Sequence, residues 1–98
     1  MNTIVVRRLA EAEIAVAKAW YELQSKGLGD RFIDEFYRSA IAIAEGPLRW
    51  PLYHGQIRRY VLHRFPYIIY FDVRPSKIRI LRVVHASQDP LAVQELMD

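Results

Sequence analysis

The sequence predicts a single α+β domain in which an antiparallel helical hairpin packs on an antiparallel β-sheet. Apolar residues recur at helical spacing through the first half, and three strand-like runs separated by short turns fill the second half. The chain has 98 residues, of which 52% are hydrophobic and 26% charged, values typical of one globular domain. We therefore expect one domain spanning residues 1–98.

The N-terminal part predicts a short strand followed by a helix. Residues 3–8 contain the β-branched run of a strand. From Leu9 to Leu23 the spacing predicts a helix with one buried stripe, and we expect Trp20 to lie in the core. Gly27 is a suitable stop for this helix. The predicted stripe consists of Leu9, Ala12, Val16, Trp20 and Leu23.

A second helix is predicted from Asp30, as N-cap, to the Gly46-Pro47 pair. The short connection from the first helix predicts antiparallel packing of the two. Its expected buried face is Phe32, Ile33, Phe36, Tyr37, Ala40, Ile41 and Ala44.

The remaining chain predicts a loop over residues 47–56 and three strands, at 57–63, 67–73 and 77–85. Their short connections require antiparallel pairing, and the first strand is expected to join the same sheet. Simple alternation places Leu81 and Val83 on one face of the last strand and Arg82 on the other. A short terminal helix is expected at residues 90–97.

Positive charge is concentrated in the strand region. Residues 57–85 hold seven basic side chains against Asp72 alone, a net charge of +6, whereas residues 1–56 are balanced. A solvated sheet face would explain some of these cations, but such faces usually mix both signs. The imbalance favours a polyanion or an acidic protein surface as the partner.

Other classes of function receive little support. Cysteine is absent and histidine occurs three times, so no metal site is expected. The absence of cysteine fits a reducing cytoplasm. We expect neither a signal peptide nor a membrane span.

Four segments carry a family resemblance: "RRLAEAEIAVAKAWYE", "GLGDRFIDEF", "RFPYIIY" (64–70) and "ILRVVH" (80–85) followed by "QDP". In this order, over about residues 4–90, they resemble the RelE/ParE toxins of bacterial type II toxin–antitoxin systems. The resemblance implies a growth inhibitor, often linked to plasmid stabilisation, that needs no cofactor. It implies a hetero-oligomer with a cognate antitoxin, which alone contacts promoter DNA.

The resemblance also implies one of two activities. RelE-like members cut mRNA on the ribosome, and ParE-like members bind and poison DNA gyrase. For RNA cutting, the candidate acids or bases are His63 and His85, because histidine titrates near neutral pH. The candidate phosphate ligands are Arg58, Arg59, Arg64 and Arg82, and Tyr60 and Tyr67 are candidate base-stacking residues.

The match to the RNA-cutting branch is incomplete. Tyr67 and Gln88 stand where RelE-like members carry arginines, and the chain ends "AVQELMD" without their terminal tyrosine or histidine. We therefore favour binding to gyrase, with mRNA cleavage and an inactive, antitoxin-binding domain as alternatives. The expected target- or antitoxin-binding residues are Trp50, Arg58, Arg59, Arg64, Tyr67, Arg79, Arg82 and His85.

Several of these residues also have ordinary structural explanations. Tyr67 and Tyr70 fall on opposite faces of one strand, so at least one belongs to the core. His85, at the end of an apolar strand, fits a histidine bonded to a backbone carbonyl. Trp50 either covers the sheet edge or is exposed for a partner.

Overall fold

A computed structural model describes residues 2–88 and confirms the α+β class. The helix expected at residues 90–97 lies outside the described residues. The elements follow in the order β1 (Thr3–Val6), α1 (Arg8–Gln24), α2 (Leu28–Glu45), the 3₁₀ turn η1 (Pro47–Arg49), β2 (Leu52–His54), β3 (Ile57–Val61), β4 (Tyr67–Arg74) and β5 (Lys77–His85).

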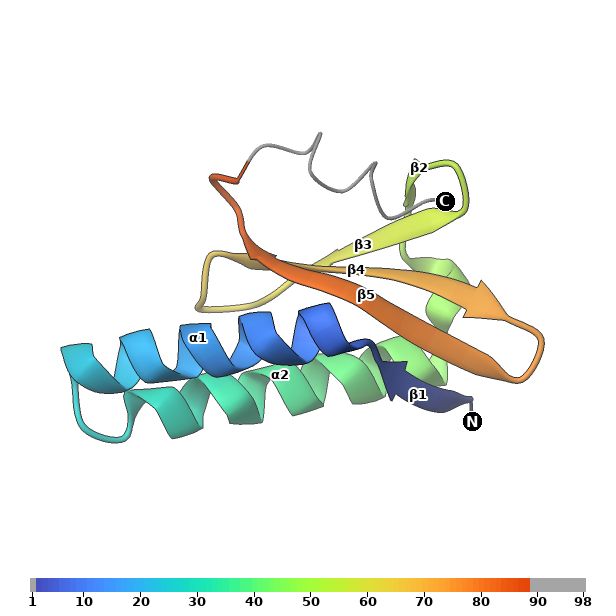
Figure 1. Cartoon of the computed structure of the whole chain (residues 1–98). Coiled ribbons are helices and arrows are strands. Elements are labelled where there is room, and N and C mark those ends of the chain that lie inside the picture. The colour runs from blue at the N-terminus through green and yellow to red at the C-terminus, as the bar shows by residue number, and fades with distance from the viewer. Residues whose placement is uncertain (1, 89–98) are drawn as a thin grey trace.

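The strands form one sheet in the order β1-β5-β4-β3-β2, and both helices cover the same face of it (Figure 1). We call this the helix face and the opposite side the outer face. β3, β4 and β5 pair antiparallel, as predicted. β1 joins β5 in parallel, so the sheet is mixed, and the helical hairpin follows β1 directly in the chain. β2, which lies within the segment expected to be a loop, pairs antiparallel with β3.

The start of α2 differs from the prediction. Gly27 takes a positive φ of 87°, and the helix begins at Leu28 without a side-chain cap from Asp30. Instead, the Glu22 carboxylate accepts the N–H groups of Gly27 (2.9 Å) and Gly29 (3.0 Å). These two bonds lower the pKa of Glu22. A side chain of α1 thus accepts two of the N–H groups at the start of α2.

Gly29 lets the two helices approach closely. A Cβ at this position would lie 2.7 Å from the backbone oxygen of Lys18, so any side chain would push α1 and α2 apart.

The predicted buried stripe of α1 is wrong. Val16, Trp20 and Leu23 are 71%, 54% and 84% exposed, and Leu9 is also exposed. The buried residues are Ala10, Ala17 and Tyr21, so α1 turns a small-residue face to the core. Alanines allow the helix backbone to lie close to β5 and α2, and apolar spacing alone does not tell which side of a helix meets them.

The prediction for α2 is correct except at its margin. Phe32, Phe36 and Ala40 are buried, as is Ala44, whereas Tyr37 and Ile41 are exposed. The buried face is narrower than the apolar stripe because α1 and the sheet together cover only part of it.

A bulge in β5 changes which residues share a face. Phe71 pairs with Ile80 but Tyr70 pairs with Arg82, so Leu81 is the extra residue. Consequently Val83 packs into the helix-face core, and Leu81 packs with the outer-face cluster. The simple alternation expected for residues 77–85 therefore fails after Ile80.

Candidate functional site

The outer face carries a row of polar side chains across three strands. Arg59 of β3 lies opposite Tyr70 of β4, which lies opposite Arg82 of β5. The Arg59 guanidinium lies over the Tyr53 ring, 5.4 Å from its centroid. Burial raises the pKa of Tyr70, Tyr53 adds to this effect, and the nearby charges of Arg59 and Arg82 oppose it. Tyr67 points to the opposite face, as the sequence predicts.

Arg82 is bound to the first helix. Its Nε donates to Glu13 Oε2 at 2.8 Å, and its Nη2 lies 2.6 Å from the same oxygen. The other oxygen of Glu13 accepts the N–H of Val83 at 3.0 Å. Glu13 therefore binds the backbone of β5 beyond Ile80, where the pairing with β1 ends.

Arg79 is likewise held by an acid. Its Nε donates to Asp72 Oδ1 at 2.9 Å, and Arg74 lies 3.4 Å from the other Asp72 oxygen. Burial raises the pKa of Asp72, but its bonds to Arg79 and the charges of both arginines outweigh this and lower it overall. The same interaction raises the pKa of Arg79. Both arginines of β5 thus form ion pairs with carboxylates of the same chain, Arg79 with Asp72 and Arg82 with Glu13.

His85 and Tyr67 lie on the α1 side of the sheet end. Their rings meet edge to face at 5.3 Å, and burial raises the pKa of Tyr67. His85 Nδ1 interacts with the Ser87 hydroxyl at 2.8 Å and accepts the Ser87 N–H at 3.1 Å. Within residues 2–88, His85 thus bonds to Ser87 rather than to a backbone carbonyl. Together with Val16 and Gln88, these rings line a groove of about 280 Å³, which we call the α1 groove.

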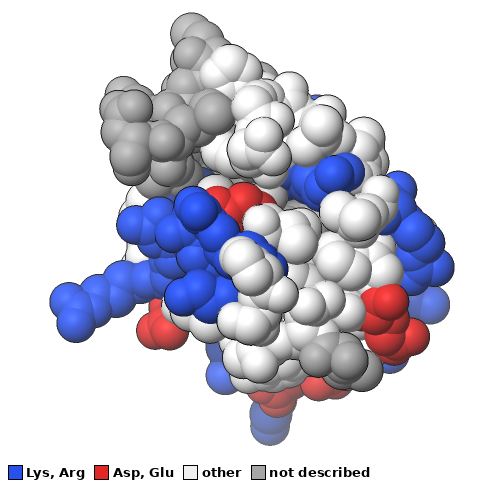
Figure 2. Space-filling model, turned by 90° about the vertical axis from the view of Figure 1, so that its right-hand side faces the viewer, with Lys and Arg blue, Asp and Glu red and all other residues white. Residues whose placement is uncertain are grey.

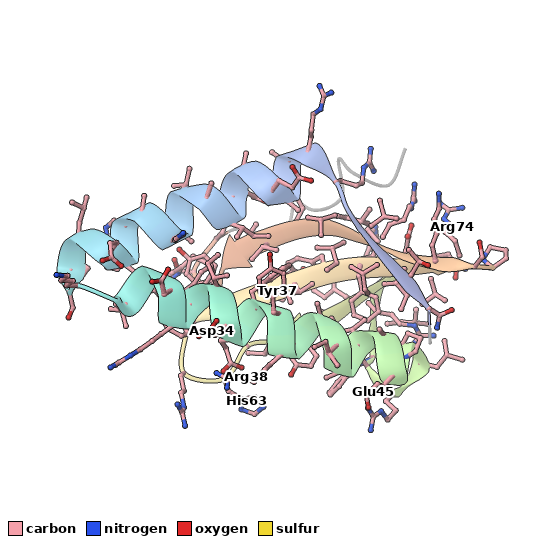
Figure 3. The ribbon with its side chains drawn as sticks, turned by 90° about the horizontal axis from the view of Figure 1, so that it is seen from below. Asp34, Tyr37, Arg38, Glu45, His63 and Arg74 are labelled. Atoms are coloured by element: carbon pink, nitrogen blue, oxygen red, sulfur yellow. The ribbon has the colours of Figure 1, made fainter. Side chains whose placement is uncertain are left out.

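His63 and Arg64 belong to the β3–β4 turn (residues 62–66) and lie on the other side, next to α2. With Arg38 they line a polar depression of about 450 Å³, and Figure 3 shows Arg38 and His63 near one another below α2. Arg38 and Arg64 also line an adjoining cleft of about 520 Å³, which we call the α2–turn cleft. Arg38 was not among the residues predicted from the sequence, because it precedes the basic strands by about twenty positions and lies on a predicted helix.

Arg58 and Trp50 form a structural pair. Arg58 Nη1 donates to the Trp50 carbonyl at 2.7 Å, and the Trp50 ring packs edge to face on Tyr60 with centroids 4.5 Å apart. Trp50 therefore covers part of the sheet. Within the described residues, its buried Nε1 has no hydrogen-bond partner.

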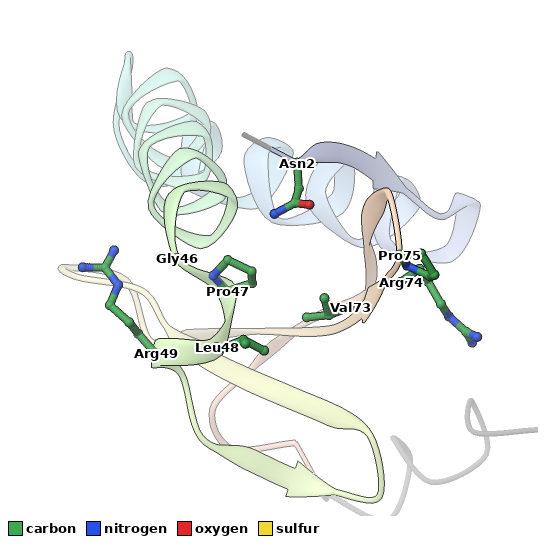
Figure 4. A pocket seen from close by; sticks show the side chains of 8 residues that line it. All are labelled: Asn2, Gly46, Pro47, Leu48, Arg49, Val73, Arg74 and Pro75. Atoms are coloured by element: carbon green, nitrogen blue, oxygen red, sulfur yellow. The ribbon is translucent and has the colours of Figure 1, made fainter.

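The hairpin end of the sheet has a shallow apolar depression of about 850 Å³ between η1 and the β4–β5 turn (Figure 4). Leu48 and Val73 supply apolar surface, and Arg49 and Arg74 lie at its two ends. Figure 2 shows basic side chains gathered on both sides of a largely uncharged area at this end. The depression is open, and nothing in the described chain encloses a ligand there.

The exposed side of α1 is the largest feature that sequence reasoning misplaced. Leu9, Val16, Trp20 and Leu23, which we call the α1 stripe, leave four large apolar side chains in solvent along one helix. Contiguous exposed apolar surface is typical of protein-binding sites, so the α1 stripe is a candidate for one. Val16 also lines the α1 groove, so the stripe and the groove are continuous.

Residues 2–88 contain no cluster of three or more His, Asp or Glu side chains that could hold a metal ion. Nor does this part of the chain contain a helix long and apolar enough to cross a membrane.

Comparison with known proteins agrees with this architecture. The family model described as "ParE toxin of type II toxin-antitoxin system, parDE" matches residues 4–90. The chain therefore belongs to the ParE toxin family. A solved structure titled "Chromosomal ParDE TA system from P. aeruginosa" has a similar fold, with a TM-score of 0.76 at 17% identity. The similarity covers 87% of this chain and 96% of that one. No curated protein matches the sequence.

Proposed function

We propose that this ParE-family toxin arrests growth in the cytoplasm by binding a protein target, DNA gyrase, and that it does not cut RNA. The observation that carries the proposal is that both arginines of β5 are paired with carboxylates. Arg82 is paired with Glu13 and Arg79 with Asp72, so neither guanidinium is presented to a phosphate. RNA cleavage needs cations beside the pentavalent phosphorus and a histidine or other acid–base group within hydrogen-bonding reach.

The two histidines also support a binding function. His85 faces the α1 groove, whereas His63 faces the depression beside α2. Tyr67, at the position of an arginine in RNA-cutting relatives, packs its ring edge to face on Phe32 at 5.1 Å. An arginine there would place a charge against this aromatic core.

The antitoxin is proposed to dock along the α1 stripe and the α1 groove, contacting Tyr67 and His85. Apolar anchors in such a helix-side groove are typical of bound amphipathic segments. Acidic residues of the antitoxin would meet the basic strands, with Arg59 as a contact. The complex is a hetero-oligomer that contacts promoter DNA through the antitoxin alone.

The test is a pair of assays on toxin freed from its antitoxin: gyrase supercoiling and mRNA cleavage in a translating extract. We expect supercoiling to stop at about equimolar toxin while mRNA stays intact. Normal supercoiling at large excess, or new 5′ ends within codons, would contradict the proposal. Normal growth on induction of folded toxin would indicate an inactive, antitoxin-binding domain.

One observation favours the alternative, a ribosome-dependent endonuclease. The depression beside α2 brings His63 together with Arg38 and Arg64, a set that could hold a phosphate and move a proton. If the toxin cuts mRNA, His63→Ala should abolish cleavage. His85→Ala with Arg82→Ala tests the other candidates that the sequence predicts for the same activity.

A further inference from the structure

The β3–β4 turn holds Arg64 in an unusual backbone conformation. Its φ is 70°, and among the described residues other than glycine it alone has a positive value. The buried side chains of Leu62 and Phe65 anchor both ends of the turn. The Leu62 N–H donates to the Tyr67 carbonyl at 2.9 Å, which closes the hairpin. Residues 63–66 therefore reverse the chain, and Arg64 takes the left-handed conformation.

Glycine or asparagine would occupy this position with less strain than arginine. Strained residues of this kind concentrate where their side chains bind something. Arg64 is exposed and lines both cavities beside α2. The Arg64 side chain thus lines the cavities beside α2, although its backbone conformation is strained.

The α2–turn cleft combines a basic rim with an apolar wall. Arg31, Arg38 and Arg64 supply three guanidinium groups, and Leu28, Phe65 and Pro66 supply apolar surface. The volume of about 520 Å³ suits one or two inserted side chains. A pocket that takes an apolar anchor inside a charged rim is the usual form of a protein–protein hot spot.

Arg38 is available to a ligand. It lies 3.6 Å from Glu35, beyond ordinary hydrogen-bond length, and its side chain is 68% exposed, whereas that of Glu35 is 10% exposed. An incoming carboxylate can therefore recruit Arg38 without dismantling a tight pair. Asp34 and Glu35 also line the cleft. Their charges oppose any anionic ligand, and a phosphate backbone more than a peptide that brings one carboxylate to the arginines and N–H groups to these two acids.

The cleft and the α1 stripe lie on different elements. The α1 groove is formed by α1, β4 and β5, whereas the α2–turn cleft is formed mainly by α2 and the turn. Tyr21 is the one described residue of α1 that lines the cleft, and its ring meets that of Trp20 at 5.1 Å, so the cleft and the α1 stripe adjoin there.

We propose that the α2–turn cleft grips the toxin's target, and that the part gripped is an acidic protein segment with an apolar anchor side chain. This inference rests on the proposed function, in which the toxin acts by binding a protein. It assigns target binding to Arg31, Arg38 and Arg64, and antitoxin binding to the α1 side.

The test uses full-length toxin freed from its antitoxin. Arg31→Glu with Arg64→Glu reverses two exposed charges of the cleft, neither of which forms an ion pair within residues 2–88. Lys26→Glu with Lys77→Glu is the control, since it changes the net charge equally and both lysines are exposed and outside the described cavities. We expect the cleft variant to need about tenfold more protein for half-inhibition of supercoiling. Its Kd for the antitoxin should stay within about threefold of wild type, and the control should match wild type in both assays.

Arg64→Gly separates function from folding. Glycine relieves the positive φ, so we expect the Tm to rise or stay level while inhibition weakens several-fold. A residue that only shapes the turn would not combine these two effects.

Several results would overturn the inference. Cleft variants that inhibit supercoiling as well as wild type would overturn it. Cleft variants that lose antitoxin affinity as strongly as they lose inhibition would also overturn it, because the cleft would then belong to the antitoxin interface. If the same variants instead abolish mRNA cleavage by an active wild type, the cleft binds RNA. A wild type that arrests growth without touching gyrase contradicts only the proposed target, and growth arrest by the variants then decides the role of the cleft. A harmless wild type overturns both.

Discussion

Glu13 and Arg82 join the first helix to the central part of the sheet. One oxygen of Glu13 receives the Arg82 guanidinium, and the other accepts the N–H of Val83. The two side chains are 18% and 10% exposed, so this ion pair is largely shielded from water. It lies where β1 no longer covers β5, and it also prevents Arg82 from serving as a free phosphate ligand.

We expect Glu13→Ala to lower the free energy of unfolding by about 2–4 kcal/mol, since it removes a shielded pair and the acceptor of a strand N–H. Urea denaturation measures the change. Glu11→Ala, an exposed acid on the same helix, should cost less than about 1 kcal/mol. Equal losses in the two variants would mean that the Glu13 bonds do not stabilise the fold.

A second ion pair predicts a pH dependence. The pKa of Asp72 is lowered in the folded state, because its bonds to Arg79 and the charges of Arg79 and Arg74 outweigh the effect of burial. A lowered folded pKa contributes stability above the unfolded value of about 3.9. That contribution is lost as the pH falls through the folded pKa.

The comparison of wild type with Asp72→Asn should therefore show a constant gap in unfolding free energy between about pH 5 and 8. We expect a gap of roughly 1 kcal/mol, because the arginines are partly exposed to solvent. The gap should close below about pH 4. Asp30→Asn, whose 3.8 Å pair with Lys18 is exposed, should show almost none. A gap that widens with acidity would reverse the assigned direction of the shift.

The fold could be predicted from the sequence because the residues that end its helices and strands are recognisable locally. Pro66 and the turn at 74–76 separate β3, β4 and β5, and Gly46-Pro47 ends α2. The parallel placement of β1 was not predictable in this way, because it depends on how the helical hairpin returns the chain to the sheet. The bulge at Leu81 was not predictable for a similar reason. Its position depends on how β5 pairs with β4, and not on the type of residue.

The candidate site was less predictable than the fold. The charge excess of residues 57–85 directed attention to its arginines, but it did not predict that Asp72 and Glu13 pair with two of them. Glu13 reaches Arg82 across 69 positions of sequence, which no local pattern reports. The stripe of α1 was recognised as apolar but assigned to the wrong side. Only the packing of Ala10 and Ala17 settles which side of α1 is inside.

The exposed stripe gives a prediction about the antitoxin. Trp20→Gln with Leu23→Gln should weaken antitoxin binding by about tenfold or more, because large apolar anchors dominate such interfaces. Stability should change by less than about 0.5 kcal/mol, since both side chains are exposed. Isothermal titration and thermal unfolding measure the two effects. Ile41→Gln, equally apolar and exposed but on α2, is the matched control and should bind normally.

Unchanged affinity in the Trp20 and Leu23 variant would place the antitoxin elsewhere. Loss of both affinity and stability would instead mean that the stripe supports the fold.

The exposed part of Arg59 predicts that the toxin's affinity for its antitoxin depends on salt concentration. Arg59 lies half-buried on the outer face over the Tyr53 ring, and it forms no ion pair with another described residue. If it meets an acidic antitoxin residue, Arg59→Glu should weaken binding and make the affinity less sensitive to salt, because surface attraction is screened within about 8–10 Å. Arg58→Glu is a poorer test, since Arg58 also holds the Trp50 carbonyl.

Titrations at several ionic strengths between about 50 and 300 mM salt, which span the range where screening sets in, would measure the Arg59 effect. Lys77→Glu, a charge reversal of the same sign at the first residue of β5, controls for the change in net charge. A salt slope that is the same in the Arg59 variant and wild type, with equal affinity, would remove Arg59 from the interface. A slope that changes equally in both variants would show that the overall field of the toxin, rather than the outer face, attracts the antitoxin.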